Sequence, residues 1–188
     1  MCKKRLFVFC FAASLACLLL ELGSLPSFAQ TPAADENYLD RIDRSIIQKL
    51  KAESGKDEAQ IYQELGLVYF QQEDFDRSFM YFNKAVALNP RAWWAWYYMG
   101  LLNMKEPEKY FKKAIQANPS FAPPYYWLAR YYCKKKNIRE SRKFFEDYIK
   151  IAKNDPEETP RIRTAERFVE LLKSGETDYR QILKKINF

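Results

Sequence analysis

The chain has 188 residues, of which 48% are hydrophobic and 29% are charged, a balance typical of a globular domain rather than a disordered chain. Its formal net charge is +7, but the basic residues form no long cluster, so we expect no nucleic-acid partner. The chain holds no histidine, which removes the usual general base and the commonest nitrogen metal ligand. Acid–base chemistry would depend on carboxylates alone. Those carboxylates stand at helical surface spacing among lysines and arginines, which is typical of a solvated face.

The first 29 residues have the pattern of a secretory signal peptide. Basic residues at positions 3–5 precede an apolar run at 6–20, and Ser27 and Ala29 place small residues where a signal peptidase reads them. We expect cleavage after Ala29 and an exported chain, periplasmic or secreted. The run is short for a helix that spans a membrane, which needs about 20 apolar residues. A retained N-terminal anchor and lipidation of Cys17 are the alternatives, although Ser14 replaces the usual leucine of a lipobox.

Removal of the leader would leave Cys133 as the single cysteine. One cysteine closes no intramolecular disulfide and builds no sulfur-rich zinc site. We therefore expect no metal, no cofactor and no enzymatic activity.

Residues 30–57 are predicted to hold a short lead and an amphipathic helix at 36–53. One face of this helix carries Leu39, Ile42, Ile46 and Leu50. We expect it to cap the segment that follows.

Residues 58–156 contain three similar segments, at about 59–92, 93–121 and 122–155. The first half of each segment repeats an aromatic residue, an apolar residue, a small residue and usually a tyrosine: Tyr62, Leu65, Gly66, Tyr69; Trp96, Met99, Gly100, Asn103; and Tyr125, Leu128, Ala129, Tyr132. The second half repeats Ser78, Phe82, Ala85; Pro107, Phe111, Ala114; and Ser141, Phe145, Tyr148. This spacing predicts pairs of helices that approach closely at the small residues, with a phenylalanine filling the contact.

The second segment is shorter than its neighbours. Pro90 and Pro119 are 29 residues apart, whereas Gly66 and Gly100 are 34 apart. The missing residues fall between the two helices, next to Asn103, which stands where tyrosine is expected. We therefore expect a second hairpin of non-standard length, with Pro107 in the first turn of its second helix.

Residues 157–188 are predicted to form C-terminal capping helices. The first begins at Thr159, and its apolar face comprises Ile162, Ala165, Phe168, Val169 and Leu172. Gly175 ends it, and a short last helix follows from about Asp178.

The residues, their order and the 34-residue period resemble the tetratricopeptide repeat, as found in exported bacterial proteins. The resemblance implies an all-α fold, a right-handed superhelical array of antiparallel helix hairpins with flanking cap helices. It also implies a concave groove, formed by the first helix of each hairpin, that holds a peptide or protein segment. In several cytosolic relatives a clamp of lysine and asparagine holds a peptide carboxylate there, but Gln63 and Leu67 stand where that clamp would begin.

A second stripe on each first helix faces the concave side by this resemblance, and we call it the groove stripe. Its members are Gln63, Leu67, Phe70, Trp94, Tyr97, Leu101, Tyr126, Arg130 and Cys133. Such a strip suits an amphipathic helix or an extended apolar peptide. The alternative is that these side chains pack against neighbouring helices, or that the terminal helix folds into the groove.

The sequence thus predicts a non-catalytic protein–protein interaction module or scaffold of the cell envelope, with a protein or peptide partner. Two alternatives stay open, an assembly-factor subunit and an envelope carbohydrate-binding protein whose Trp94, Tyr97 and Tyr126 stack on sugar rings. Peripheral association with the envelope is compatible with either. The oligomeric state is left open.

Overall fold

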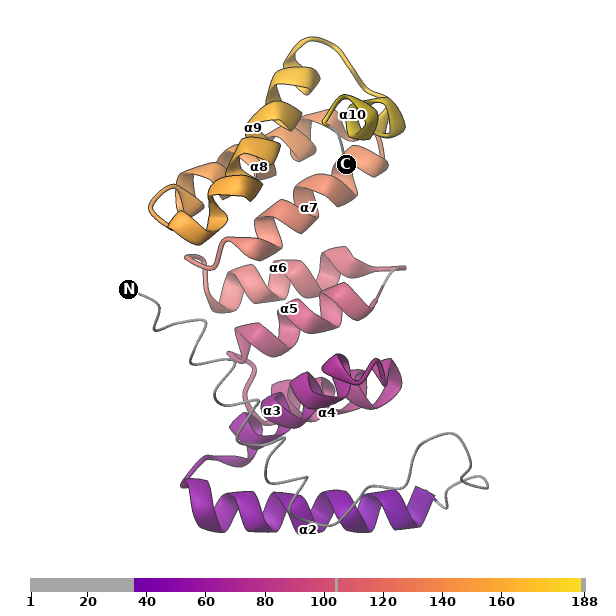
Figure 1. The fold of residues 1–188 in the computed structure, drawn as a ribbon, viewed down its shortest axis with the longest axis vertical. Coiled ribbons are helices and arrows are strands. Elements are labelled where there is room, and N and C mark those ends of the chain that lie inside the picture. Colours follow the sequence, from indigo (N-terminus) through magenta and orange to yellow (C-terminus); the bar gives the residue numbers. More distant parts are fainter. Residues whose placement is uncertain (1–35, 104, 187–188) are drawn as a thin grey trace. The chain divides into compact units, whose positions relative to one another are not determined.

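The computed structural model describes residues 36–103 and 105–186, with side chains from residue 44 onward. These residues form nine α-helices, one short 3-10 helix and no strand, so the predicted all-α class is confirmed. The α-helices are α2 (Glu36–Ser54), α3 (Glu58–Gln71), α4 (Phe75–Leu88), α5 (Trp93–Leu102), α6 (Pro107–Ala117), α7 (Pro123–Lys134), α8 (Ile138–Ala152), α9 (Thr159–Lys173) and α10 (Tyr179–Lys185) (Figure 1). The 3-10 helix η1 spans Pro156–Glu158.

Three pairs of consecutive helices pack against each other as antiparallel hairpins. The first hairpin is α3 with α4, the second is α5 with α6, and the third is α7 with α8. Each pair falls within one of the segments expected from the sequence. The chain divides between Leu88 and Asn89 into two compact units.

The first unit contains α2 and the first hairpin. Its core comprises Ile46, Ile47, Leu50, Ile61, Leu65 and Tyr81. Asp57 starts α3 with a capping box, because its side chain accepts from the backbone N–H of Gln60 while Gln60 Oε1 accepts from the N–H of Asp57. Helix α2 presents two of its four predicted face residues to this core, Ile46 and Leu50; Leu39 and Ile42 lie outside the described side chains.

The second unit contains the second and third hairpins, η1, α9 and α10. Its main core gathers α7, α8, α9 and α10 around fully buried side chains that include Phe145, Tyr148, Phe168 and Ile182. Helix α9 begins at Thr159 as expected and ends before Gly175. Of its predicted apolar face, four residues are buried and Ile162 is half-buried.

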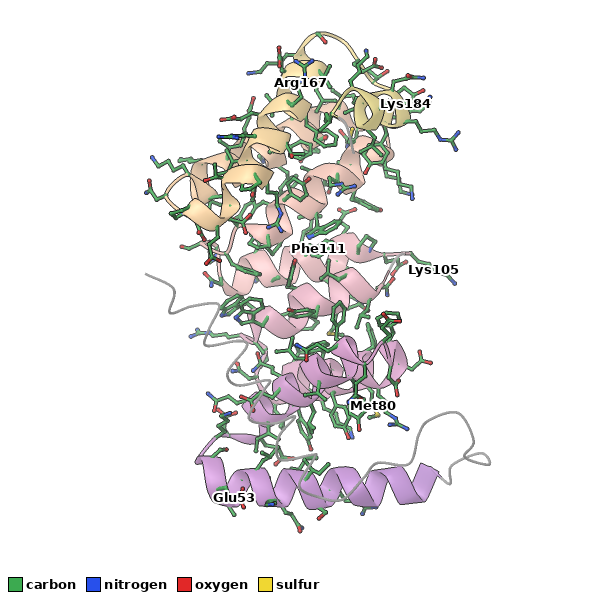
Figure 2. All side chains as sticks on the ribbon, in the orientation of Figure 1. Glu53, Met80, Lys105, Phe111, Arg167 and Lys184 are labelled. Carbon is green, nitrogen blue, oxygen red and sulfur yellow. The ribbon has the colours of Figure 1, made fainter. Side chains whose placement is uncertain are left out.

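The two glycines of the repeat lie where helices touch. A methyl group placed on Gly66 would come within 2.7 Å of the ring of Phe82. The same group on Gly100 would come within 2.5 Å of the ring of Phe111, which is labelled on α6 in Figure 2. Real Cβ atoms are not found that close to ring carbons. The close approach inferred from the small residues is therefore present in both the first and second hairpins.

The predicted signal peptide, residues 1–29, lies outside the described residues. Within 36–103 and 105–186, no helix combines the length and the apolar character needed to cross a membrane.

Candidate partner-binding surface

In the first unit, the three members of the groove stripe are half-buried along α3. Gln63 donates from Nε2 to the backbone carbonyl of Ala59 at 3.4 Å. The ring of Phe70 lies 6.0 Å from that of Phe75, which is 50% exposed at the start of α4. This face of α3 therefore keeps accessible apolar surface beside one amide group.

In the second unit, Trp94, Tyr97 and Leu101 of α5 are also half-buried. The ring of Trp94 lies 4.6 Å from that of Trp93 and 4.9 Å from that of Phe121, which precedes α7. Tyr97 meets the same Phe121 ring edge-on at 5.2 Å. These aromatics thus pack against their neighbours, as the alternative interpretation expected, while part of each side chain stays accessible.

The stripe behaves differently on α7. Tyr126 is only 3% exposed, because its ring packs against Phe145 and Tyr148 of α8, and the guanidinium of Arg161 from α9 lies over its face. Cys133 is fully buried. The structure places both residues in the core of the second unit, where neither ring nor thiol is available to a partner in this arrangement.

Trp127, which the sequence analysis did not select, is the aromatic residue that joins α7 to α5. Its Nε1 donates to the hydroxyl of Tyr97 at 3.3 Å, and the guanidinium of Arg130 lies 5.2 Å from its ring centre. Residues 127 and 130 are three apart and share one side of the helix, so helical spacing alone could have identified the pair.

Arg130 is held from two directions. Its guanidinium lies over the rings of Tyr126 and Trp127, and its Nε and Nη2 donate to the hydroxyl of Tyr179 on α10 at 3.2 and 3.1 Å. The expectation that a terminal helix covers part of the groove thus fits the third hairpin. The predicted stripe is half-exposed on α5, whereas on α7 Tyr126 and Cys133 are buried and Arg130 is half-buried.

Burial controls the protonation of the tyrosines around this surface. It raises the pKa of Tyr97 and of Tyr126 above the usual range. Burial also raises the pKa of Tyr148, and the hydrogen bond that Tyr148 donates to Glu158 raises it further. All three phenols are therefore neutral at physiological pH and act as hydrogen-bonding groups rather than as bases.

The described residues bring together no group of three or more cysteine, aspartate or glutamate side chains suited to a metal ion.

The geometry does not favour the carbohydrate alternative. Tyr126, one of its three proposed stacking platforms, is buried in the core of the second unit.

Two family models of the tetratricopeptide repeat match the chain, one over residues 59–91 and one over residues 110–143. The chain contains tetratricopeptide repeats. The first match coincides with the first hairpin, and the second runs from within α6 to within α8. The resemblance expected from the spacing is thereby confirmed. The comparison with curated proteins finds no match.

Solved structures of similar fold include a crystal structure of MamA, with a TM-score of 0.55 and 19% identity over 84% of this chain and 92% of that chain. A MamA RS-1 double mutant aligns with a TM-score of 0.53 and 18% identity, covering 81% of this chain and 86% of that one. MamA from Desulfovibrio magneticus RS-1, residue 41 to the end, aligns with a TM-score of 0.53 and 19% identity, covering 81% of this chain and 88% of that one. At this identity the likeness concerns the fold alone.

Tetratricopeptide repeats are generally non-catalytic modules that mediate protein–protein interactions, and neither matching family model describes an enzyme. The repeats and the fold support a scaffold that binds other proteins.

Proposed function

We propose that the chain binds a peptide or protein segment through the half-exposed side chains of the groove stripe. The observation that supports this most directly is helix α5. All ten of its residues are apolar or aromatic, yet its stripe members Trp94, Tyr97 and Leu101 keep accessible surface. Half-exposed aromatic side chains are the commonest anchors of protein interfaces.

The chemistry of this surface selects the partner. Accessible groups are mostly rings and aliphatic carbons, and Arg130 supplies the positive charge at one edge. An apolar or amphipathic segment satisfies such a strip, because burial of its apolar side releases water from both surfaces. A strongly charged partner would leave its charges without counterions over α5.

Site-specific photo-crosslinking tests this proposal in intact cells. A photoreactive amino acid replaces Leu101 of the groove stripe, and in a matched control it replaces Gln116, which is exposed on α6 of the same hairpin. We expect discrete protein adducts from position 101 and none of the same adducts from position 116. Identical adducts at both positions, or none at 101, would contradict the assignment of the groove stripe as the binding surface.

We further propose that the chain acts in the cell envelope after export. The support is the leader pattern at residues 1–29, with small residues at Ser27 and Ala29. N-terminal sequencing of the protein recovered from the envelope fraction tests it, and we expect a start at Gln30. A lipid-bearing start at Cys17 or an intact Met1 would overturn cleavage after Ala29, and recovery from the cytoplasm alone would overturn export.

A further inference from the structure

Helix α10 presents one apolar side to the core of the second unit. Ile182 is fully buried, and Tyr179, Leu183 and Ile186 are partly buried against the same cluster. Relative to Tyr179 these residues stand three, four and seven positions on, which places all four on one face of a helix. The face of α10 thus has the spacing of a helical ligand in a groove.

Tyr179 anchors this face at one end. Its hydroxyl accepts from Nε and Nη2 of Arg130 on α7, at 3.2 and 3.1 Å. Its ring lies 6.4 Å from that of Phe168 on α9, which in turn stacks on Phe145 at 4.7 Å. Tyr179 therefore accepts the hydrogen bonds of Arg130, and its ring extends the stack formed by Phe145 and Phe168 in the core.

The opposite side of α10 faces solvent. Arg180, Gln181, Lys184 and Lys185 are exposed there, and Lys184 is labelled in Figure 2. Lys185 forms an ion pair at 2.6 Å with Glu176, which belongs to the connection leading into the helix. Since this pair lies within the terminal segment itself, it does not fasten α10 to the rest of the unit.

Helix α10 is short for a helix whose apolar side is buried in a core. The helix has seven residues, and isolated helices shorter than about 12–15 residues are marginal in water. The preceding connection includes Gly175, which has a φ of 91°, a conformation that glycine adopts without strain. Asp178 starts the helix by accepting from the N–H of Arg180. Helix α10 therefore depends on its seat for its structure, which is the property of segments that open locally.

We propose that the surface of α7 and α9 around Arg130 and Phe168 is a binding site for an amphipathic helix of another protein, and that α10 is its exchangeable internal occupant. This inference rests on the proposed function and names its partner. The partner helix carries an aromatic hydroxyl or similar acceptor for Arg130, followed by branched aliphatic residues three, four and seven positions on. While α10 is seated, the site is closed, and the apparent affinity for the partner falls by the fraction of open molecules.

The chain supplies its own probe for this site. A labelled synthetic peptide of residues 176–186 copies the internal occupant, and its binding to the full chain is measured by fluorescence anisotropy. The unsubstituted chain is compared with a full chain carrying Ile182→Asp, which unseats α10 by burying a charge. The matched control chain carries Gln181→Asp, an exposed position next to it.

We expect the peptide to bind the Ile182→Asp chain at least about tenfold more tightly than the other two chains, because a tethered occupant competes at an effective concentration in the millimolar range. A peptide that itself carries Ile182→Asp should bind none of them. Equal binding to all three chains, or no binding to the Ile182→Asp chain while its circular dichroism is native, would overturn the exchangeable seat.

Amide hydrogen exchange of the unsubstituted chain decides the matter if the Ile182→Asp chain fails to fold. We expect the amides of α10 to exchange faster than those of α8 and α9, through local opening. Exchange of α10 only together with α8 and α9 would show that it is a permanent cap, which overturns the proposal.

The two proposals fail in different ways. Loss of peptide binding with position-101 adducts intact would remove the α10 seat and leave the proposed function standing. Loss of those adducts with peptide binding intact would remove the α5 surface instead. If the Ile182→Asp chain, mixed with the unsubstituted chain, forms a heterodimer through the α10 of the unsubstituted chain, the occupant is a second copy of this chain, and the foreign partner is withdrawn.

Discussion

The first and third hairpins are built alike, and the second reaches the same helix contact by another route. In the first hairpin the hydroxyl of Ser78 donates to the carbonyl of Gly66 at 2.9 Å, and in the third Ser141 donates to Ala129 at the same distance. Both serines are fully buried. In the second hairpin Pro107 holds the corresponding place and offers no donor.

The connections differ in the same way. In the first and third hairpins the turn passes through one non-glycine residue in the left-handed region, Glu73 with φ 62° and Lys136 with φ 60°. In the second hairpin Asn103 closes the turn, since its Oδ1 accepts from the N–H groups of Lys105 and Glu106 at 3.2 and 2.9 Å. The expectation that residues are missing between the two helices is wrong, because the helices themselves are short: α5 and α6 have 10 and 11 residues, against 14 each in α3 and α4. The close contact of glycine with phenylalanine is present in the second hairpin as in the first, so the repeat depends on this contact more than on the length of its helices.

Substitution of the contact glycines should have the largest effect on stability. Gly100→Val and Gly66→Val each force a branched side chain against a phenylalanine ring, which should cost roughly 1–3 kcal/mol or more of unfolding free energy. Chemical denaturation measures it, with Gln116→Val as the control for an exposed helical valine. An unchanged midpoint for Gly100→Val would break the equivalence of the second hairpin with the others.

Loss of the buried serine hydroxyl should have a smaller effect on stability. Ser78→Ala and Ser141→Ala each remove one hydrogen bond to a helix carbonyl, which should cost about 1 kcal/mol. The exposed Ser120→Ala serves as control and should stay within about 0.5 kcal/mol of the unsubstituted chain. If neither Ser78→Ala nor Ser141→Ala lowers the free energy of unfolding, the missing hydrogen bond at Pro107 has no energetic consequence.

The sequence predicted the contact and missed the hydrogen bonds. Glycine and phenylalanine at the repeat spacing indicate a close crossing, because only one side chain fits there. Ser78 was read simply as small, and Asn103 as a departure from the pattern, since periodicity carries no information about which polar atom faces which. Trp127 and the seat of α10 were missed for a related reason: helical spacing tells which residues share a face but not which later segment covers it.

Asn103→Ala should reduce the stability of the second unit by about 1 kcal/mol, because two backbone N–H groups lose their acceptor. Asn103→Asp keeps the accepting oxygen and should change little. Thermal unfolding of both variants tests the role of this side chain. If Asn103→Asp lowers the melting temperature as much as Asn103→Ala does, the side-chain oxygen at position 103 does not stabilise the turn.

The smallest expected effect is a gain. Lys136→Gly relieves the left-handed conformation of an exposed residue and keeps its N–H bond to the carbonyl of Cys133, so stability should rise by up to about 1 kcal/mol. Lys135→Gly, one position earlier with φ −79°, should instead lower it. A gain at position 135 and a loss at 136 would reverse the assignment of the strained residue.

The distribution of tryptophan has a spectroscopic consequence. All four tryptophans of the chain, at positions 93, 94, 96 and 127, lie on α5 and α7, so their emission originates in the second unit alone. Far-ultraviolet circular dichroism records helices of both units. Excitation at a wavelength that tyrosine does not absorb therefore follows one unit selectively. The two signals coincide during unfolding only if the units melt together, so the native chain carries its own optical label for their independence.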